Sequence, residues 1–472
     1  MQDIIMYSSA ILAVVILGYM LIKKMDIKIA LFMMGIVLIL ISIGMGNDIA
    51  IKDFESTGSP LLDPLQVIVE QFKDTFSKAG LIILILGGYT AYMTSIGAND
   101  VTVQLLTKPI GKVKSVYVLV PIVFLLGNLL SLVIPSASTL AILLLATLYP
   151  VLKQAKMSTL TIAAIIATSA TIIPTPLGSD NVAIAEELAK YAQFADMNVT
   201  NYVFSYHAIV SLPTLLFIAL VHYLWQKRMD KKLEHTGHHE EIEVQKVDEI
   251  KGGSLFKAVY GILPVFPIIL LLISFILELT AGITISIGVE SAVLVSLILA
   301  IICELIRHKG DKAVLSNTEK FFEGMGKVFP IVALIVAASV FVTGLKSIGL
   351  INELQQSMGH LQGGNVSFIL PLIMVSLTAL IVLLSGSGIA LFFAMVPLMV
   401  PLAEAAGISP IAISIPMGLA GNLFRAVSPV AAVVLIIAGT LKLDPLDIIK
   451  RTSVPMISGV VFMFILSMIF FL

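Results

Sequence analysis

The stretch from Ile173 to Asn181 constrains the fold more than any other part of the chain, because it interrupts a long apolar run. It reads IPTPLGSDN and has apolar sequence on both sides. Its two prolines and its glycine cannot continue a helix, and each proline removes a backbone donor. In hydrocarbon, freed backbone groups are tolerated only where protein or a water-filled cavity satisfies them, and a carboxylate such as Asp180 costs about 3 kcal/mol more. The stretch is therefore predicted to form a binding site.

Composition places this break in a membrane. The 472 residues are 58% hydrophobic and 12% charged, with a mean hydropathy of +1.04, whereas soluble domains carry about a quarter charged residues. Cys303 is the single cysteine, which excludes a disulfide framework and a cysteine metal site. Asp3 precedes the first apolar run and two lysines follow it, the reverse of a secretory signal. The N-terminus is therefore expected outside, and no nucleic-acid partner is expected.

Apolar segments of about 20 residues, enough to span a bilayer, recur along the chain. Full spans are predicted at 5–22, 27–44, 81–96, 206–225, 262–279, 283–306, 328–345 and 453–471, and an interfacial helix at 61–76. Two further apolar segments, 117–152 and 368–403, are too short on either side of a polar centre for two crossings. They are predicted to be re-entrant helical hairpins with serines at their tips. Two others, 158–189 and 410–438, are predicted to be broken helices.

A charged stretch at 227–257 divides the chain nearly in half and is expected to be a cytoplasmic linker. It contains His235, His238 and His239, which could bind a metal, although no fixed ligand spacing repeats there. A solvated linker is the favoured interpretation.

The two halves, 1–226 and 258–472, carry the same landmarks. Ser136 and Ser385 lie 249 positions apart, and so do Ser179 and Ser428. A hairpin tip and a helix break that keep one register in both halves indicate an internal repeat. Five crossings plus a hairpin that returns to its own side would invert the second copy. With the N-terminus outside, 23 of the 29 basic residues fall on the inner side, as the positive-inside rule requires.

The predicted fold class is therefore an all-α polytopic membrane protein of two inverted repeats. Each repeat has five spanning helices, one broken at the midplane, and one re-entrant helical hairpin. Inverted repeats with discontinuous helices are the design of secondary transporters. Helix N-termini at the breaks favour an anion. The candidate substrate-binding residues are Ser136, Ser138, Thr139, Thr175, Ser179, Ser385, Gly386, Ser387, Gly388, Asn422, Arg425 and Ser428.

Two ionisable residues at membrane depth leave alternatives open. Arg425 is expected to bind a substrate carboxylate through its planar fork, but it could instead pair with Asp180 or reach the inner surface. Asp180, with Asn181, is the candidate coupling site for a proton or a cation, and Asp180 could also cap the following helix. Asn128, Asn181 and Asn422 are each a ligand or an interhelical contact. No metal and no other cofactor is expected.

Four motifs together carry a resemblance to a known family. They are GYTAYMTSIGAND at 88–100, PSASTLAILLLATLYPV at 135–151, PTPLGSD at 174–180 and GNLFRAVSPVAAVV at 421–434. They resemble the anaerobic C4-dicarboxylate carriers of the DcuC type, within the ion transporter superfamily. The resemblance implies a bacterial inner-membrane homodimer that exchanges or takes up succinate, fumarate, malate or aspartate by an elevator-like movement.

Sodium-coupled members of the wider superfamily place Ser-Asn-Thr at their hairpin tips. Here the tips read Ser136-Ala137-Ser138-Thr139 and Ser385-Gly386-Ser387-Gly388, without the asparagine. Proton coupling and exchange are therefore expected at least as much as sodium coupling. The alternatives are a carrier of another organic anion or of an amino acid, and an anion channel. The sequence has no His-Glu-x-x-His helix, nucleophile–base pairing or P-loop, so no enzyme is expected.

Overall fold

The computed structural model describes residues 2–23, 25–51, 54–113, 115–134, 136–234, 253–282, 287–353, 367–386 and 389–472. Throughout these ranges the regular structure is helical, without a strand, which confirms the predicted all-α class. The linker histidines, Ser387 and Gly388 lie outside the described residues.

Many of the described helices are apolar enough to cross a bilayer. Seven have the required length and composition: Ile27–Gly44, Asp63–Ser95, Val199–Lys232, Ser254–Ala281, Val289–Arg307, Ala313–Ser347 and Pro445–Phe471. The first helix, α1, spans Gln2–Ile22. Part of α1 is among seven shorter apolar helices of 10–17 residues that the described chain also contains. The chain is therefore a multi-pass membrane protein.

The segments expected to be interrupted consist of two or three shorter helices each. The first hairpin segment contains α6 (Val116–Ser131), α7 (Ala137–Thr147) and α8 (Tyr149–Gln154), and the second contains α19 (Ile369–Ser385) and α20 (Ile389–Ala406). The first broken helix is α9 (Thr159–Ala167) and α10 (Ser179–Leu188), and the second is α21 (Ile411–Arg425) and α22 (Ala432–Leu441). The connecting segments, 168–178 and 426–431, are called here the first break and the second break.

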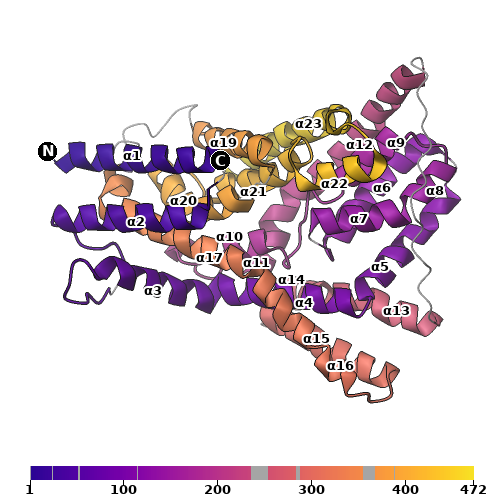
Figure 1. Cartoon of the computed structure of the whole chain (residues 1–472), viewed down its shortest axis with the longest axis horizontal. Helices are drawn as coiled ribbons and strands as arrows, with labels where there is room; N and C mark the ends of the chain where they lie inside the picture. Colours follow the sequence, from indigo (N-terminus) through magenta and orange to yellow (C-terminus); the bar gives the residue numbers. More distant parts are fainter. Residues whose placement is uncertain are drawn as a thin grey trace.

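One group of helices is assembled around α17 (Glu319–Ser347), which packs along α2 (Ile27–Gly44) and α4 (Leu81–Ser95) (Figure 1). Glycines make these contacts close. A Cβ at Gly324 would lie 2.6 Å from the carbonyl oxygen of Gly87, and one at Gly344 would lie 2.8 Å from Cβ of Leu38. Small residues of this kind let helix backbones approach one another within a bilayer. We call α2, α4 and α17 the α17 group.

A second group contains both predicted hairpin segments and both breaks. Here α12 (Ala208–Glu234) packs against α23 (Pro445–Phe471) and α6, while α7 packs on α22 and α19 packs on α21 (Figure 1). We call these helices, with α9, α10 and α20, the α12 group. The remaining helices are α3 (Asp63–Thr75), α5 (Ala98–Thr107), α11 (Val199–Asn201), α13 (Ser254–Ile262), α14 (Phe266–Ala281), α15 (Val289–Arg307) and α16 (Ala313–Ser316).

The end of α12 differs from the sequence expectation. The helix continues to Glu234, through the first residues of the expected solvated linker, and both Gln226 and Asp230 are buried. These two residues are one turn apart, so both face α23. There the Arg451 guanidinium donates through Nη1 to Asp230 Oδ1 at 2.5 Å and to Gln226 Oε1 at 3.2 Å. A buried ion pair therefore joins α12 to α23.

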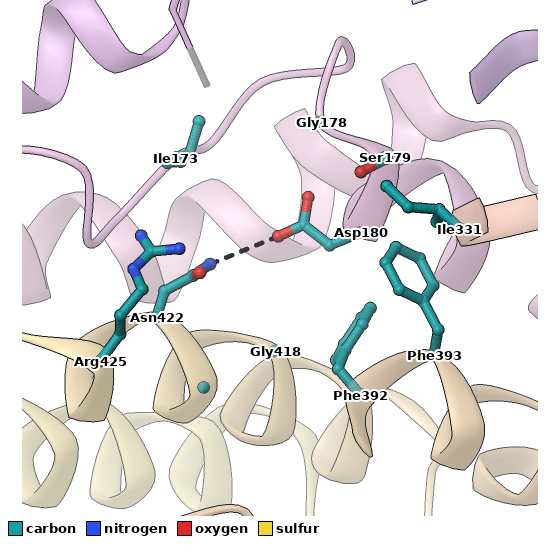
Figure 2. Close-up of a pocket in the computed structure, with 11 residues that line it drawn as sticks. Ile173, Gly178, Ser179, Asp180, Ile331, Phe392, Phe393, Gly418, Asn422 and Arg425 are labelled. Atoms are coloured by element: carbon teal, nitrogen blue, oxygen red, sulfur yellow. Dashed lines mark hydrogen bonds between the residues drawn. The ribbon is translucent and has the colours of Figure 1, made fainter. Parts of the chain in front are cut away.

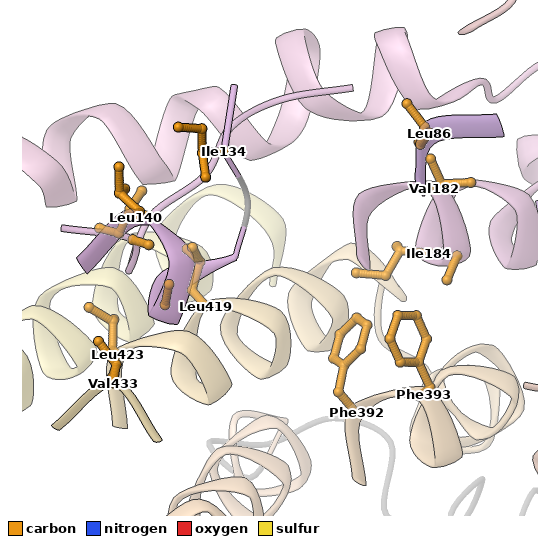
Figure 3. Close-up of a cluster of buried hydrophobic side chains, with 14 of the residues drawn as sticks. Leu86, Ile134, Leu140, Val182, Ile184, Phe392, Phe393, Leu419, Leu423 and Val433 are labelled. Atoms are coloured by element: carbon orange, nitrogen blue, oxygen red, sulfur yellow. The ribbon is translucent and has the colours of Figure 1, made fainter. Parts of the chain in front are cut away.

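Apolar side chains pack where α7, α10, α20 and α21 come together. Figure 3 shows Phe392 and Phe393 of α20 facing Ile184 of α10. The same view shows Leu419 of α21 close to Leu140 of α7. All five side chains are buried. The polar residues of the breaks are therefore enclosed by hydrophobic side chains from both halves of the chain.

Candidate functional site

A cavity of about 110 Å³ lies between the first break and α21 (Figure 2). Gly178, Ser179 and Asp180 line it at the start of α10, and Asn422 and Arg425 line it from the last turns of α21. Four of the residues singled out from the sequence, in segments more than 240 positions apart, therefore share one cavity. We call it the central cavity.

Side-chain amides hold the first break in place. Asn128 of α6 accepts hydrogen bonds through Oδ1 from the backbone N–H groups of Thr171 and Ile172, each at 3.0 Å. Asn181 donates through Nδ2 to the carbonyl oxygens of Ile173 at 3.1 Å and Thr175 at 2.9 Å. These bonds satisfy backbone N–H and C=O groups of the interrupted segment that have no helical partner. Asn128 and Asn181 therefore both make hydrogen bonds to the backbone of the first break.

Asp180 lies in the first turn of α10. Gly178 is the N-cap and gives no side-chain bond, so Asp180 is not the capping residue. Its Oδ1 accepts from the backbone N–H of Asn181 at 3.0 Å, and its Oδ2 accepts from Asn422 Nδ2 at 3.4 Å (Figure 2). A carboxylate at a helix N-terminus is favoured by the helix dipole.

Arg425 ends α21 and is half-buried at the cavity. Its Nη2 donates to the carbonyl oxygen of Ala170 in the first break at 2.5 Å. Within the described chain Arg425 has no carboxylate within ion-pair distance. Asn422 lies between Arg425 and Asp180 (Figure 2). The predicted alternative of a direct Arg425–Asp180 ion pair is therefore not what this structure shows, although both charges face the same space.

Several lining residues were not predicted from the sequence. Gly418 and Gly421 leave one face of α21 without side chains, Phe392 and Phe393 form a wall from α20, and Ile331 of α17 completes it. The two rings meet edge to face, with centroids 5.1 Å apart. The two glycines could have been identified from the sequence, because positions 418, 421, 422 and 425 fall on one helical face. The two phenylalanines could not have been identified in this way, because most phenylalanines in such a chain face lipid or pack against other helices.

The first hairpin tip does not line the central cavity. Ser136 caps α7, accepting from the backbone N–H of Thr139 at 3.3 Å and from its hydroxyl at 3.0 Å. Ser136 and Thr139 are exposed and Ser138 is half-buried. Substrate contact by these three residues remains a prediction.

The second hairpin tip packs against the second break. Gly386 has a φ of +74°, and a Cβ there would lie 2.5 Å from the carbonyl oxygen of Val430. Ser428 donates to the carbonyl oxygen of Leu383 at 3.0 Å, and Ser385 donates to that of Ile381 at 2.7 Å. These residues fix the tip beside the break without lining the cavity. Thr175 is buried inside the first break, where its hydroxyl accepts from the N–H of Leu177 at 3.2 Å.

Among the described residues, no three His, Cys, Asp or Glu side chains lie together in a way that could hold a metal ion. The polar content of the central cavity is one guanidinium, one carboxylate, one amide and one hydroxyl, beside a helix N-terminus. This arrangement can bind a small anion by charge and hydrogen bonds.

Two solved structures share the fold. The YdaH transporter of Alcanivorax borkumensis superposes with a TM-score of 0.64 at 16% identity, over 94% of this chain and 98% of that one. MtrF of Neisseria gonorrhoeae, one of a class of antimetabolite efflux pumps, gives 0.61 at 16% identity, over 94% and 95%. At this identity the likeness concerns the fold alone.

Relatives are also found by sequence. The anaerobic C4-dicarboxylate transporter DcuC of Escherichia coli O6:H1 is 36% identical over 432 residues, which cover 91% of this chain and 89% of that protein. A probable anaerobic C4-dicarboxylate transporter DcuC of Vibrio cholerae is 33% identical over 456 residues, covering 96% and 95%. The family model for DcuC, the C4-dicarboxylate anaerobic carrier, matches residues 5–472. The resemblance seen in the four sequence motifs is thereby confirmed, and the chain belongs to the DcuC family of C4-dicarboxylate anaerobic carriers.

Proposed function

We propose that the protein is a secondary carrier of C4-dicarboxylates such as succinate, fumarate, malate and aspartate. The family and the names of its relatives support this substrate class. The proposal rests mainly on the environment of Arg425. Its guanidinium faces the central cavity, and among the described residues its side chain donates one hydrogen bond, to the backbone carbonyl of Ala170. A carboxylate is the ligand that a guanidinium fork matches best.

The second carboxylate of such a substrate would meet the start of α10. Ser179 offers a hydroxyl there, and the helix N-terminus offers backbone N–H groups and a positive dipole end. Asn422, between Arg425 and Asp180, can donate to either end of the molecule. In this binding mode one substrate molecule touches both broken helices.

Charge balance then calls for a partner ion or for exchange. Arg425 and Asp180 cancel each other, so a bound dianion would leave two negative charges in a cavity of low dielectric. Three modes would resolve this imbalance. A proton could bind to Asp180, a cation could bind beside Asp180, or the carrier could work by exchange, in which the site returns across the membrane with a second dianion bound. These three modes can be separated by measuring whether succinate uptake is driven by a proton gradient, by a sodium gradient or by succinate inside the vesicles.

For the movement itself we propose an elevator. The α12 group would carry the central cavity across the bilayer against the α17 group. The protein would work as a homodimer in the bacterial inner membrane, with both termini outside and the linker in the cytoplasm. The lysine and arginine distribution supports this orientation.

The central test is Arg425→Ala in proteoliposomes that take up labelled succinate by counterflow. Because truncating a charged hydrogen-bonding partner in a buried site costs about 2–5 kcal/mol, kcat/KM should fall at least roughly 30-fold. Arg425→Lys should be intermediate, since an ammonium keeps the charge but not the fork. A monodisperse elution profile and an unchanged melting temperature would show that the fold is intact. Succinate uptake at the wild-type rate by a folded Arg425→Ala variant would contradict the proposal.

A further inference from the structure

A second, larger cavity of about 510 Å³ lies toward the side of the membrane assigned to the outside. It is bounded by α3 and the turn that follows it, by α10, by α17 and by α20. Its polar lining includes Asp74, Lys78, Glu187, Lys190, Thr343 and Lys346. We call it the outer vestibule.

The outer vestibule follows the same seam as the central cavity. On α20, Pro397 lines the vestibule and Phe393 lines the central cavity. These positions are about 6 Å apart along the helix at 1.5 Å per residue. On α10, Glu187 lines the vestibule and Asp180 the central cavity. The two spaces are therefore separated by about one turn along α20 and about two turns along α10, with both phenylalanine rings lining the central cavity.

Most charges of the vestibule neutralise one another. Asp74 contacts Lys78 at 2.6 Å and Lys190 at 3.1 Å, and Lys190 also contacts Glu187 at 3.1 Å. Glu70, which also lines the space, pairs with Lys73 at 2.8 Å. Each of these carboxylates is therefore paired with at least one lysine.

Lys346 is the exception. Its Nζ lies 3.4 Å from the Tyr191 hydroxyl and 5.8 Å from the centre of that ring, with no carboxylate inside 4 Å among the residues described. The charges that act on it from farther away are those of Glu187, Glu404 and Lys190. Next to it along α17, Thr343 presents a hydroxyl that accepts from Gln71 Nε2 at 3.2 Å. The recess therefore keeps one half-buried ammonium without a direct counter-ion.

We propose that the outer vestibule is a first binding site for a small dicarboxylate dianion, in which Lys346 contacts one carboxylate before the molecule passes the phenylalanines to Arg425. This inference rests on the proposed dicarboxylate function and adds a second, sided site to it. A charge in a recess with low-dielectric walls raises the local concentration of an oppositely charged solute. The effect should act on entry from the outside alone, because the vestibule opens on that face.

The test compares Lys346→Gln with Lys450→Gln, which removes the same charge from an exposed lysine whose acidic partner, Asp447, also lies outside the vestibule lining. Succinate transport is measured from each face in oriented proteoliposomes. For Lys346→Gln, the KM from the outer face should rise about threefold to tenfold, with the maximal rate and the KM from the inner face unchanged. The rise of the outer KM with added salt should also flatten. Lys346→Arg should keep the wild-type KM, and Lys450→Gln should match the wild type at both faces.

An unchanged outer KM, or an equal rise at both faces, would overturn the inference. If the wild type transports no dicarboxylate at all, the proposed function fails instead, and the two failures are distinct. A second measurement does not depend on folding of a Lys346 variant. In Arg425→Ala protein, succinate should still slow the labelling of Lys346 by an amine reagent, read by mass spectrometry, and leave Lys450 unaffected. Equal labelling of Lys346 with and without succinate would also overturn it.

Discussion

Arg425 owes its position to the way its helix ends. It occupies the last turn of α21, where a cation is favoured by the helix dipole, and its one hydrogen bond reaches across to the first break. Asp180 occupies the mirror situation at the start of α10. Opposite charges therefore face each other across the central cavity, each held by its own helix end and not by a direct contact.

A substitution at Gly418 tests whether substrate occupies the central cavity more directly than substitutions of the charged lining residues do. A methyl group added there would lie 3.5 Å from Phe392 Cε2 and 3.8 Å from Ile184 Cδ1, which is ordinary contact. Replacing a helix-interior glycine by alanine favours the helix by about 1 kcal/mol. Gly418→Ala should thus keep or raise the melting temperature while it raises the KM for succinate roughly tenfold, the effect of one methylene in a fitted pocket.

Gly439→Ala supplies the matched control for this substitution. Gly439 lies in α22, and a Cβ there meets no atom within 4 Å. It should show the same gain in helix stability and an unchanged KM. A wild-type KM in both variants would show that substrate does not occupy the space beside Gly418.

Sequence reasoning located Ser179, Asp180, Asn422 and Arg425 because prolines, glycines and charges are conspicuous in apolar segments. All four line the central cavity. The positions of the tip serines were less predictable, since a serine at a helix start can cap its own helix, as Ser136 does. His222 of α12 is fully buried, within hydrogen-bond distance of Gln226 one turn along the same helix and of Thr168 in the first break; the contact with Thr168, 54 positions away, follows from no local spacing.

At the scale of elements, the crossing of α12 and α23 depends on the buried pair of Asp230 and Arg451. Thr161 of α9 contributes its hydroxyl to both members, 3.0 Å from each. Trp225, the only tryptophan of the sequence, donates to the carbonyl oxygen of Lys450 at 3.1 Å at the same crossing. Three helices of the α12 group are thereby tied together at one end.

Breaking this pair on one side should be costly. Arg451→Met leaves the Asp230 carboxylate buried without its cation, which should lower the free energy of unfolding by about 3–5 kcal/mol. Fluorescence of Trp225 during denaturant unfolding in detergent reports the change at the crossing itself. The double variant Arg451→Met/Asp230→Leu should recover most of the loss, because it removes both charges. Equal stability of Arg451→Met and wild type would show that the pair does not brace the group.

The sequence could not reveal this crossing. Asp230 lies in a run of charged residues that is typical of a solvated linker, and its partner is 221 positions away. No spacing rule connects the two. By contrast, the ends of the hairpins and broken helices are marked locally by proline, glycine and serine, so the helices of these segments begin and end close to the predicted bounds.

At the scale of the whole molecule, the two cavities lie along the seam between the α12 group and α17. Ile331 of α17 lines the central cavity, and Thr343 and Lys346 of the same helix line the outer vestibule. The ion pair of Lys190 with Asp74 also joins α10 to α3 across the vestibule. In the proposed elevator movement this pair would break each time the α12 group moves toward the inner face. The state with the pair formed and the state with the pair broken would therefore differ in how their stability depends on salt.

The most direct measurement is a cryo-electron microscopy map of the protein with succinate bound. The account predicts ligand density in the central cavity, with one carboxylate on the Arg425 guanidinium and the other at the start of α10 beside Ser179. The guanidinium should then have left the carbonyl oxygen of Ala170. A map in which succinate binds elsewhere while Arg425 keeps that carbonyl contact would contradict the account.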